Sequence, residues 1–536
     1  MSGTQTNAEL ELPEDVAALK AHIAHLTTQL AARDAAVAAR DEAIETLQEQ
    51  VRLLLARRFG ASSERVADGQ LGLFNEAEEL EAGDEENAHE DESDVAVAGH
   101  TRRRRGKRAP LPEHLPRIDV VHELPADQRV CPHDGATLEP FAEETSEQLD
   151  VEPARFRVLH HRRVKYRCPC CAESLRTAPM PAQPIAKSQA SPGLLAFIAT
   201  SKYVDGVPLY RLAQQFERIG VEVPRQTQAR WMVQSGELLQ PLINLLRERL
   251  LEGAYIHCDE STVQVLDEPG KSAESKSYMW VQVAGTGEQP VVLFDYDPTR
   301  AAEVPRRLLE GFSGYLHTDA YSGYNDVARD ADITRVLCLA HARRHFVDGL
   351  KALGINPKKL PAKPPAKARR LLTAVSYFRH IYAIERRIRG RPPDERYEVR
   401  QRETRPVLER LHAWATATCP KVAPKTPLGK ALAYLLEHWE GLTRFLDDGR
   451  LEVDNNRAEN AIRPFTVGRK NWLFSATVEG AKASANLYSL VETAKANGLE
   501  PYAYLRHVLT DLPKAQSIED IETLLPWHIE RESLTL

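Results

Sequence analysis

Three carboxylates in different local settings are the residues of this chain best suited to chemistry. Asp259 follows a short apolar run at residues 254–256, and Asp319 follows another at 314–316, so both are expected at the ends of β-strands. Glu459 lies in DNNRAENAIRPFTVGRKNW, which is predicted to be helical. Hard oxygen ligands from three separate elements can hold two divalent cations about 3.5–4 Å apart. This arrangement predicts phosphoryl transfer on nucleic acid.

Longer phrases around these carboxylates carry a family resemblance. HTDAYSGY, CLAHARRHF and DNNRAENAIRPFTVGRKNWLFS resemble the DDE transposase of the IS66 family of insertion sequences. LLLARRFGASSER, EQLDVEPARFRVLHHRRVKYRC and LYSLVETAKANGLEPYAYL extend the likeness over nearly the whole chain. The resemblance implies a transposase that binds the ends of an insertion sequence and cleaves and transfers DNA strands. Asp259, Asp319 and Glu459 would then be catalytic ligands of Mg²⁺, which Mn²⁺ can replace, because all-oxygen sites suit hard cations.

Each carboxylate has competitors nearby. Strand alternation sends neighbouring side chains to opposite faces, so only one of Asp259 and Glu260 can reach the site. Asp454 competes with Glu459, but Asp454-Asn455-Asn456 is interpreted as the capping stretch that leaves Glu459 about one turn inside the helix. Cys338 and His341 are interpreted as structural, because no further metal ligand is evident beside them. Further acidic candidates, interpreted as surface residues, are Asp295, Asp297 and Asp326.

The order of elements indicates how the carboxylates converge. Three consecutive strands are expected between residues 252 and 298, followed by a helix, the strand GYLHTDAY, a short helical piece and the strand TRVLCLAH. This β-β-β-α-β-α-β order is that of an RNase H-like domain, in which the first and fourth strands lie side by side. Asp259 would thus lie next to Asp319, which follows 60 residues later (319 − 259 = 60). The next interval of 140 residues (459 − 319 = 140) predicts a helical insertion.

With 536 residues the chain is too long for one hydrophobic core and is predicted to be a multidomain α/β protein. The RNase H-like catalytic domain is expected in two parts, 251–341 and 449–480. The remaining segments are a coiled coil at 1–66, an acidic and basic disordered linker at 67–115, a zinc-ribbon-like module at 116–188, a helical, helix-turn-helix-like DNA-binding region at 189–250, an all-α insertion at 342–448 and a C-terminal helical region at 481–536.

Apolar residues recur in a 4-3 pattern over residues 16–55. Largely β-branched residues at one position with Leu at the other favour a parallel two-stranded coiled coil, and therefore a homodimer or higher oligomer. The alternative is a long amphipathic helix packed within its own chain. The first track is Val16, Ile23, Leu30, Val37, Ile44 and Val51; the second is Leu19, Leu26, Leu47 and Leu54, interrupted by Arg33 and Arg40.

Four of the seven cysteines fall within residues 131–171, which favours a metal over a disulfide scaffold. Cys168 and Cys171 have the C-x-x-C spacing of a zinc knuckle. The resemblance would supply a second such pair at 131–134, but Asp occupies position 134. Cys131 with His133 or Asp134 can still complete a Zn²⁺ site, and the alternative is a metal-free remnant of the module.

Two groups of polar and basic residues are predicted to contact DNA. One lies at the start of the second helix of the helix-turn-helix-like pattern, where groove contacts are expected. The other accompanies the carboxylates, where phosphate contacts are expected. The first group is Arg225, Gln226, Thr227 and Arg230; the second is Arg343, Arg344, Arg457, Arg463, Arg469 and Lys470.

The net charge of −7 argues, by itself, against a nucleic-acid partner, but the charge is segregated. An acidic run at 76–94 precedes a basic run at 102–108. Without a membrane-length apolar run or a signal pattern, the chain is expected in the bacterial cytoplasm, associated with the nucleoid. The resemblance adds small accessory proteins of the same element as partners. Two other functions remain open: a nuclease of the same fold, and an inactive DNA-binding remnant.

Overall fold

The computed structural model describes residues 15–59, 156–167, 175–285, 289–329, 332–357 and 364–534. The chain divides into two compact units, one formed by residues 91–181 and the other by the rest of the chain. In the first unit, β1 (Lys165–Arg167) pairs antiparallel with β2 (Leu175–Thr177). The predicted zinc ligands lie outside the described residues: Cys131, His133, Asp134, Cys168 and Cys171.

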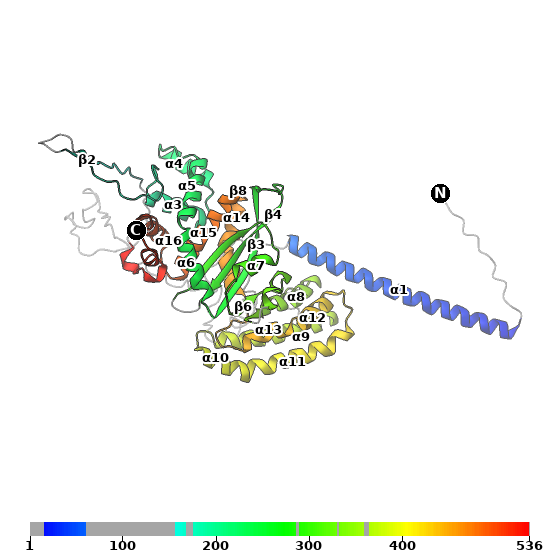
Figure 1. Cartoon of the computed structure of the whole chain (residues 1–536). Coiled ribbons are helices and arrows are strands. Elements are labelled where there is room, and N and C mark those ends of the chain that lie inside the picture. Colours follow the sequence, from blue (N-terminus) through cyan, green and yellow to red (C-terminus); the bar gives the residue numbers. More distant parts are fainter. Residues whose placement is uncertain are drawn as a thin grey trace, which may run out of the picture. The chain divides into compact units, whose positions relative to one another are not determined.

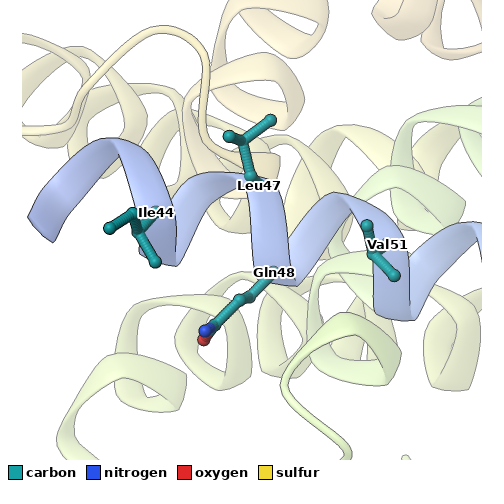
Figure 2. Close-up of a pocket in the computed structure, with 4 residues that line it drawn as sticks. All are labelled: Ile44, Leu47, Gln48 and Val51. Carbon is teal, nitrogen blue, oxygen red and sulfur yellow. The ribbon is translucent and has the colours of Figure 1, made fainter. Parts of the chain in front are cut away.

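Helix α1 (Val16–Phe59) is a continuous helix of 44 residues, as the heptad pattern predicts. Seven of its apolar residues are exposed to solvent, with exposed fractions between 45% and 63%, whereas Leu19 is partly buried. In Figure 2 the side chains of Ile44, Leu47 and Val51 project from this helix, and with Gln48 they line a shallow, almost wholly apolar hollow. The exposed apolar residues are Ile23, Leu26, Leu30, Val37, Ile44, Leu47 and Val51.

A mixed six-stranded sheet forms the centre of the larger unit (Figure 1). The strands run in the order β5-β4-β3-β6-β7, and β8 pairs with the far end of β3. Neighbours β5, β4 and β3 are antiparallel, whereas β3, β6 and β7 are parallel. The bounds are β3 Tyr255–Asp267, β4 Lys276–Ala284, β5 Val291–Asp297, β6 Gly314–Thr318, β7 Ile333–Leu337 and β8 Ser475–Thr477.

The connections agree with the predicted order of elements. Helix α7 (Glu303–Leu308) joins β5 to β6, and the short helical piece between β6 and β7 consists of two 3₁₀ turns, at Ser322–Tyr324 and Val327–Arg329. Helix α15 (Val478–Ala496) covers the free edge of β5, where Ser489 Oγ and Thr493 Oγ1 accept hydrogen bonds from the backbone N–H groups of Phe294 and Val292. These side chains satisfy an edge that would otherwise present unpaired backbone groups.

Helices before and after the sheet share one hydrophobic core with it. Among them, α4 and α5 form the helix pair predicted in the helix-turn-helix-like region, and α14 packs against β3 and β4. Their bounds are α3 Pro192–Tyr203, α4 Leu209–Arg218, α5 Arg225–Leu238, α6 Gln240–Leu251, α14 Asn456–Trp472, α16 Pro501–Asp511 and α17 Ile518–Glu522.

A second core belongs to the helices between β7 and α14, which gather beside β6 in Figure 1. The two ends of this helical segment meet: Leu339 N donates to Val453 O (3.1 Å), and Asn455 N donates to Cys338 Sγ (3.2 Å). A long helical segment can therefore interrupt the sheet-bearing region without separating β7 from α14. Its helices are α8 Leu339–Ala352, α9 Arg369–Arg387, α10 Pro393–Val399, α11 Arg405–Thr418, α12 Pro427–Glu437 and α13 Trp439–Thr443.

Among the described residues, every helix is too short or too polar to cross a membrane.

Candidate functional site

Strand pairing places Asp259 and Asp319 side by side. Strands β3 and β6 are parallel, with Tyr255 opposite Tyr315 and His257 opposite His317. The offset in both pairs is 60 residues (315 − 255 and 317 − 257), which equals the separation of the two aspartates. Because side chains two positions apart share a face, Asp259 and Asp319 follow His257 and His317 on one face of the sheet.

Asp319 begins the turn after β6, and its Oδ1 accepts a hydrogen bond from Tyr321 N (2.9 Å). Arg335, on the neighbouring strand β7, fixes this turn. Its guanidinium donates to Asp319 O (2.7 Å), Tyr321 O (2.8 Å) and Thr318 Oγ1 (2.9 Å). Arg335 is 8% exposed, so these charge-assisted bonds lie away from bulk water. They determine where the Asp319 carboxylate projects.

Asp259 is held in an electrostatically unfavourable place. Burial raises its pKa well above the ordinary value, and the neighbouring carboxylates Glu260, Glu459 and Asp319 raise it further. Glu260 is occupied elsewhere, because it accepts hydrogen bonds from Arg300 Nε (2.6 Å) and Tyr324 OH (2.8 Å). Of the two neighbours on β3, Asp259 is thus the carboxylate without a neutralising side chain among the described residues.

Glu459 reaches the site from the first turn of α14, and its side chain is 2% exposed. Neither carboxylate oxygen accepts a hydrogen bond from a described residue. Oε1 lies 3.7 Å from His341 Nδ1, and Oε2 lies 3.9 Å from a guanidinium nitrogen of Arg344. Burial raises the pKa of Glu459 to about 7; Asp319 acts in the same direction and Arg344 opposes it. The carboxylate therefore lacks the hydrogen bonds that normally accompany burial.

Asn455 anchors the start of α14 to β3. Its Nδ2 donates to Cys258 O (2.8 Å), and its Oδ1 lies 2.9 Å from His257 Nδ1. Asn455 is at the N-cap position, but its side chain makes no capping bond to the helix. The sequence interpretation as a capping stretch was therefore wrong for this side chain, which is used in tertiary contacts instead. Asp454 Oδ1 accepts from Asn456 N (3.2 Å), as expected of a turn residue before a helix.

Asn455→Ala should lower both stability and any cleavage that depends on Glu459. It leaves Cys258 O and His257 Nδ1 without their partner in a buried place, which costs about 2–4 kcal/mol. Thermal unfolding by circular dichroism measures the loss. Asn471→Ala, at the exposed far end of the same helix, is the matched control and should change the melting temperature little. Equal effects of the two substitutions would contradict the anchoring role.

Two buried histidines lie behind the aspartates. The rings of His257 and His317 stack with their centroids 4.7 Å apart, and each side chain is 1% exposed. Burial lowers the pKa of His317 well below its ordinary value, and His257 and His341 lower it further. The two stacked imidazole rings are thus uncharged and pack next to the aspartates.

Cys338 and His341 were expected to be structural because the sequence offered them no third ligand. The fold supplies one: a cysteine, a histidine and Glu459 place one donor atom each within 4.8 Å of one another. Cys338 is at the N-cap of α8 and His341 is in its first turn. No local signal predicted this grouping, because Glu459 follows His341 by 118 residues (459 − 341 = 118).

The other acidic candidates are engaged with basic residues outside the carboxylate group. Asp295 accepts from Arg247 (2.5 Å), Asp297 from Arg307 (2.9 Å) and Asp326 from Arg329 (2.9 Å). Asp326 is exposed, as expected of a surface residue, whereas Asp295 and Asp297 are partly buried, so the interpretation of these two as surface residues was wrong.

Some of the residues predicted to contact DNA are exposed, and others are buried or bonded to groups within the chain. Within α5, Arg225, Gln226 and Arg230 are exposed and Thr227 is partly buried. Arg343 is 5% exposed, whereas Arg344 faces Glu459. On α14, two arginines are bonded within the chain: Arg457 donates to Glu452 and to Gly285 O, and Arg469 donates to Thr262 Oγ1 (3.0 Å). Arg463 on the same helix is partly buried, and Lys470 is exposed.

Sequence reasoning missed Arg335 and Asn455. A signal for Arg335 existed, since an arginine within the apolar strand ITRVL must find partners when it is buried. Asn455 had a weaker signal as the middle residue of DNN.

Comparisons with known proteins cover almost all of the chain. The description "Transposase IS66 family" matches residues 187–483, and "IS66 C-terminal element" matches 489–527. "Transposase C of IS166 homeodomain" matches residues 46–120, and "zinc-finger binding domain of transposase IS66" matches 128–172. The last two matches overlap the predicted coiled coil and zinc module.

Three similar proteins come from Sinorhizobium fredii, and all are described as uncharacterized. Protein y4jD is 35% identical over 430 residues, 78% of this chain and 81% of its own length. Protein y4qI is 33% identical over 561 residues, 98% of this chain and 99% of its own length. Protein y4hP is 28% identical and covers 91% of this chain and 89% of its own length. No solved structure is significantly similar.

Proposed function

Because the chain belongs to the IS66 transposase family, we propose that it is a metal-dependent DNA transposase, which binds the ends of an insertion sequence and cleaves and transfers DNA strands. The strand order β5-β4-β3-β6-β7 supports an RNase H-like catalytic domain. The register of β3 against β6 carries the proposal, since it brings Asp259 and Asp319 to one edge and α14 adds Glu459.

The three carboxylates suit hard divalent cations such as Mg²⁺ or Mn²⁺. Glu459 and Asp319 both raise the pKa of Asp259, and Asp319 raises the pKa of Glu459. The three carboxylates are therefore close enough to interact electrostatically. Three acidic groups in one place repel each other unless protons or cations compensate. The unpartnered oxygens of Glu459 provide free ligand positions. Asp259, Asp319 and Glu459 would hold the ions, which supply a more acidic water and offset charge on the leaving oxygen.

The proposed reaction consists of two displacements at phosphorus. In cleavage, water attacks the phosphodiester at the end of the element, the P–O3′ bond breaks, and the 3′ oxygen leaves as a hydroxyl. In strand transfer, that hydroxyl attacks a target phosphodiester and displaces the target's 3′ oxygen, so one P–O bond forms as another breaks. Arg344, which lies 3.9 Å from Glu459, is suitably placed to contact a phosphate held by cations at the three carboxylates.

DNA recognition is proposed for the exposed start of α5. Arg225, Gln226 and Arg230 are polar and exposed in its first two turns, as expected for the second helix of a helix-turn-helix. Thr227 lies beside them. Lys470 and Arg463 on α14 would extend the basic surface from the carboxylates along the helix.

The direct test is to incubate the purified chain with its own element ends, a target duplex and Mg²⁺. Cleaved ends together with joined products support the transposase. Cleavage without joined products would favour the nuclease alternative, and binding without cleavage would favour the inactive remnant. Omitting the divalent cation should stop both steps and leave binding measurable.

A parallel coiled coil through α1 is proposed to pair two chains. The seven exposed apolar residues form a stripe at heptad spacing, which two helices would bury by knobs-into-holes packing. Pairing would place two carboxylate centres in one particle, as two element ends require.

Leu26→Asp with Leu30→Asp should therefore reduce the oligomer to single chains, because charges in the seam of a coiled coil cannot be buried. Light scattering on the full-length chain measures the mass. Thr28→Asp lies between them on the outer side of the heptad and should leave the mass unchanged. An unaltered mass of the double variant would contradict dimerisation through α1.

A further inference from the structure

Three donors of different chemical hardness converge beside the proposed catalytic carboxylates. Cys338 is the N-cap residue of α8, His341 lies in the first turn of that helix, and Glu459 lies in the first turn of α14. One ligand atom of each lies within 4.8 Å of the other two. The proposed phosphoryl transfer uses Glu459 but gives no role to the thiol or the imidazole.

These donors are poorly satisfied by the protein. His341 Nδ1 and both oxygens of Glu459 are buried without a hydrogen-bond partner in the described chain, and Glu459 is 2% exposed. A buried polar atom without a partner costs about 1–3 kcal/mol, and more when it is charged. Two of these atoms, His341 Nδ1 and Glu459 Oε1, lie 3.7 Å apart, which favours a cation bound between them.

The donor set identifies the class of ligand. Sulfur, nitrogen and oxygen donors from Cys, His and Glu are the ligands of Zn²⁺, whereas Mg²⁺ takes oxygen alone. Asn455 N donates to Cys338 Sγ (3.2 Å), and the start of α8 places the positive end of the helix dipole at this sulfur. Burial raises the pKa of the Cys338 thiol well above its ordinary value and the hydrogen bond from Asn455 N opposes this, so Zn²⁺ must displace the thiol proton when it binds. Three protein ligands leave a fourth position of a tetrahedral ion open.

We propose that Cys338, His341 and Glu459 form a Zn²⁺ site next to the hard-cation centre, and that Zn²⁺ bound there withdraws Glu459 and inhibits cleavage. The inhibitory part rests on the proposed transposase function, whereas the binding part does not. Glu459 is a ligand in both sites. Binding of Zn²⁺ to Cys338, His341 and Glu459 therefore excludes binding of Mg²⁺ by all three catalytic carboxylates.

Zinc binding is tested on the metal-stripped full-length chain, titrated with Zn²⁺ alone and assayed by equilibrium dialysis and elemental analysis. Cys338→Ser and His341→Gln should each lower the bound zinc by about one equivalent per chain. Zinc bound by residues 128–172 would be common to all of these proteins and cancels in the difference. Cys419→Ser, a partly buried free cysteine outside the site, is the matched control and should bind as much zinc as the unaltered chain.

Co²⁺ provides a second readout, because a thiolate ligand gives a sulfur-to-cobalt charge-transfer band. The part of this band that depends on Cys338 should disappear in Cys338→Ser and persist in Cys419→Ser. His341→Gln, a change at a partly exposed side chain, serves if Cys338→Ser does not fold. Unchanged zinc stoichiometry and an unchanged cobalt spectrum in a folded variant would overturn the site.

Inhibition is measured as the ratio of Mg²⁺-supported cleavage with and without added Zn²⁺, for each protein separately. Free Zn²⁺ at about ten times its Kd should reduce cleavage by the unaltered chain about tenfold, and His341→Gln should be inhibited much less. An equal ratio for both proteins would overturn the inhibitory role. If the chain binds Zn²⁺ through Cys338 yet never cleaves DNA, the proposed function fails while the site stands.

Discussion

Asp319→Asn is expected to abolish Mg²⁺-dependent cleavage while leaving the fold and DNA binding intact. The substitution replaces one of the three negatively charged ligands, so the site binds divalent cations more weakly than in the unaltered chain. Cleavage should fall by at least ~10³-fold, equivalent to about 4 kcal/mol of transition-state stabilisation. The fold should persist because an amide oxygen can still accept the hydrogen bond from Tyr321 N, and Arg335 binds the backbone of the turn rather than the carboxylate.

The assay for Asp319→Asn combines cleavage of a labelled element end with a gel-shift measurement on the same preparation. Asp326→Asn, an exposed aspartate paired with Arg329, is the matched control and should cleave normally. Retained cleavage by Asp319→Asn in Mg²⁺ would show that the reaction does not depend on this carboxylate.

Glu459→Gln is expected to have two opposite effects, loss of cleavage and a gain in stability. Burial raises the pKa of Glu459 to about 7, from an ordinary value of 4.5. Because the pKa is higher in the folded chain than in the unfolded chain, stability is fully present below about pH 4.5 and is lost as the pH rises through about 7. The neutral glutamine avoids this loss, so at pH 8 it should stabilise the metal-free chain on the order of 2–3 kcal/mol.

The measurement is the melting temperature in a chelating buffer at pH 5 and pH 8. The advantage of Glu459→Gln should be present at pH 8 and small at pH 5. Glu310→Gln changes an exposed glutamate and should show no such dependence. A lower melting temperature of Glu459→Gln at pH 8 would mean that the buried carboxylate is compensated by groups within the chain.

Together these outcomes would show that the site is built at the expense of stability. Glu459 and Asp319 add to the effect of burial in raising the pKa of Asp259, and Asp319 does the same for Glu459. The chain keeps these carboxylates in place through Arg335 and Asn455. Such conflict between stability and activity is common where binding requires uncompensated charge.

The local sequence was sufficient to predict most of the elements, whereas the catalytic role of the three carboxylates stays a prediction. Apolar runs identified β3 and β6, although the expectation that Asp259 ends its strand was wrong, because β3 continues to Asp267. The heptad pattern, interrupted at Arg33 and Arg40, identified α1. The order of elements also predicted that β3 and β6 lie side by side, which the structure confirms, and the structure adds that they are parallel. These features are encoded within short windows of the chain, where periodicity and turn residues are visible.

Only the tertiary structure decided which side chains support the carboxylates. Asn455 contacts His257, 198 residues away, and Glu459 meets Cys338 and His341 across the whole helical segment between β7 and α14. The local periodicity does not predict these contacts, because the contacts depend on how the two ends of that segment pack against β3. The residues that do chemistry are thus recognisable by type and position, whereas their partners are selected by long-range packing.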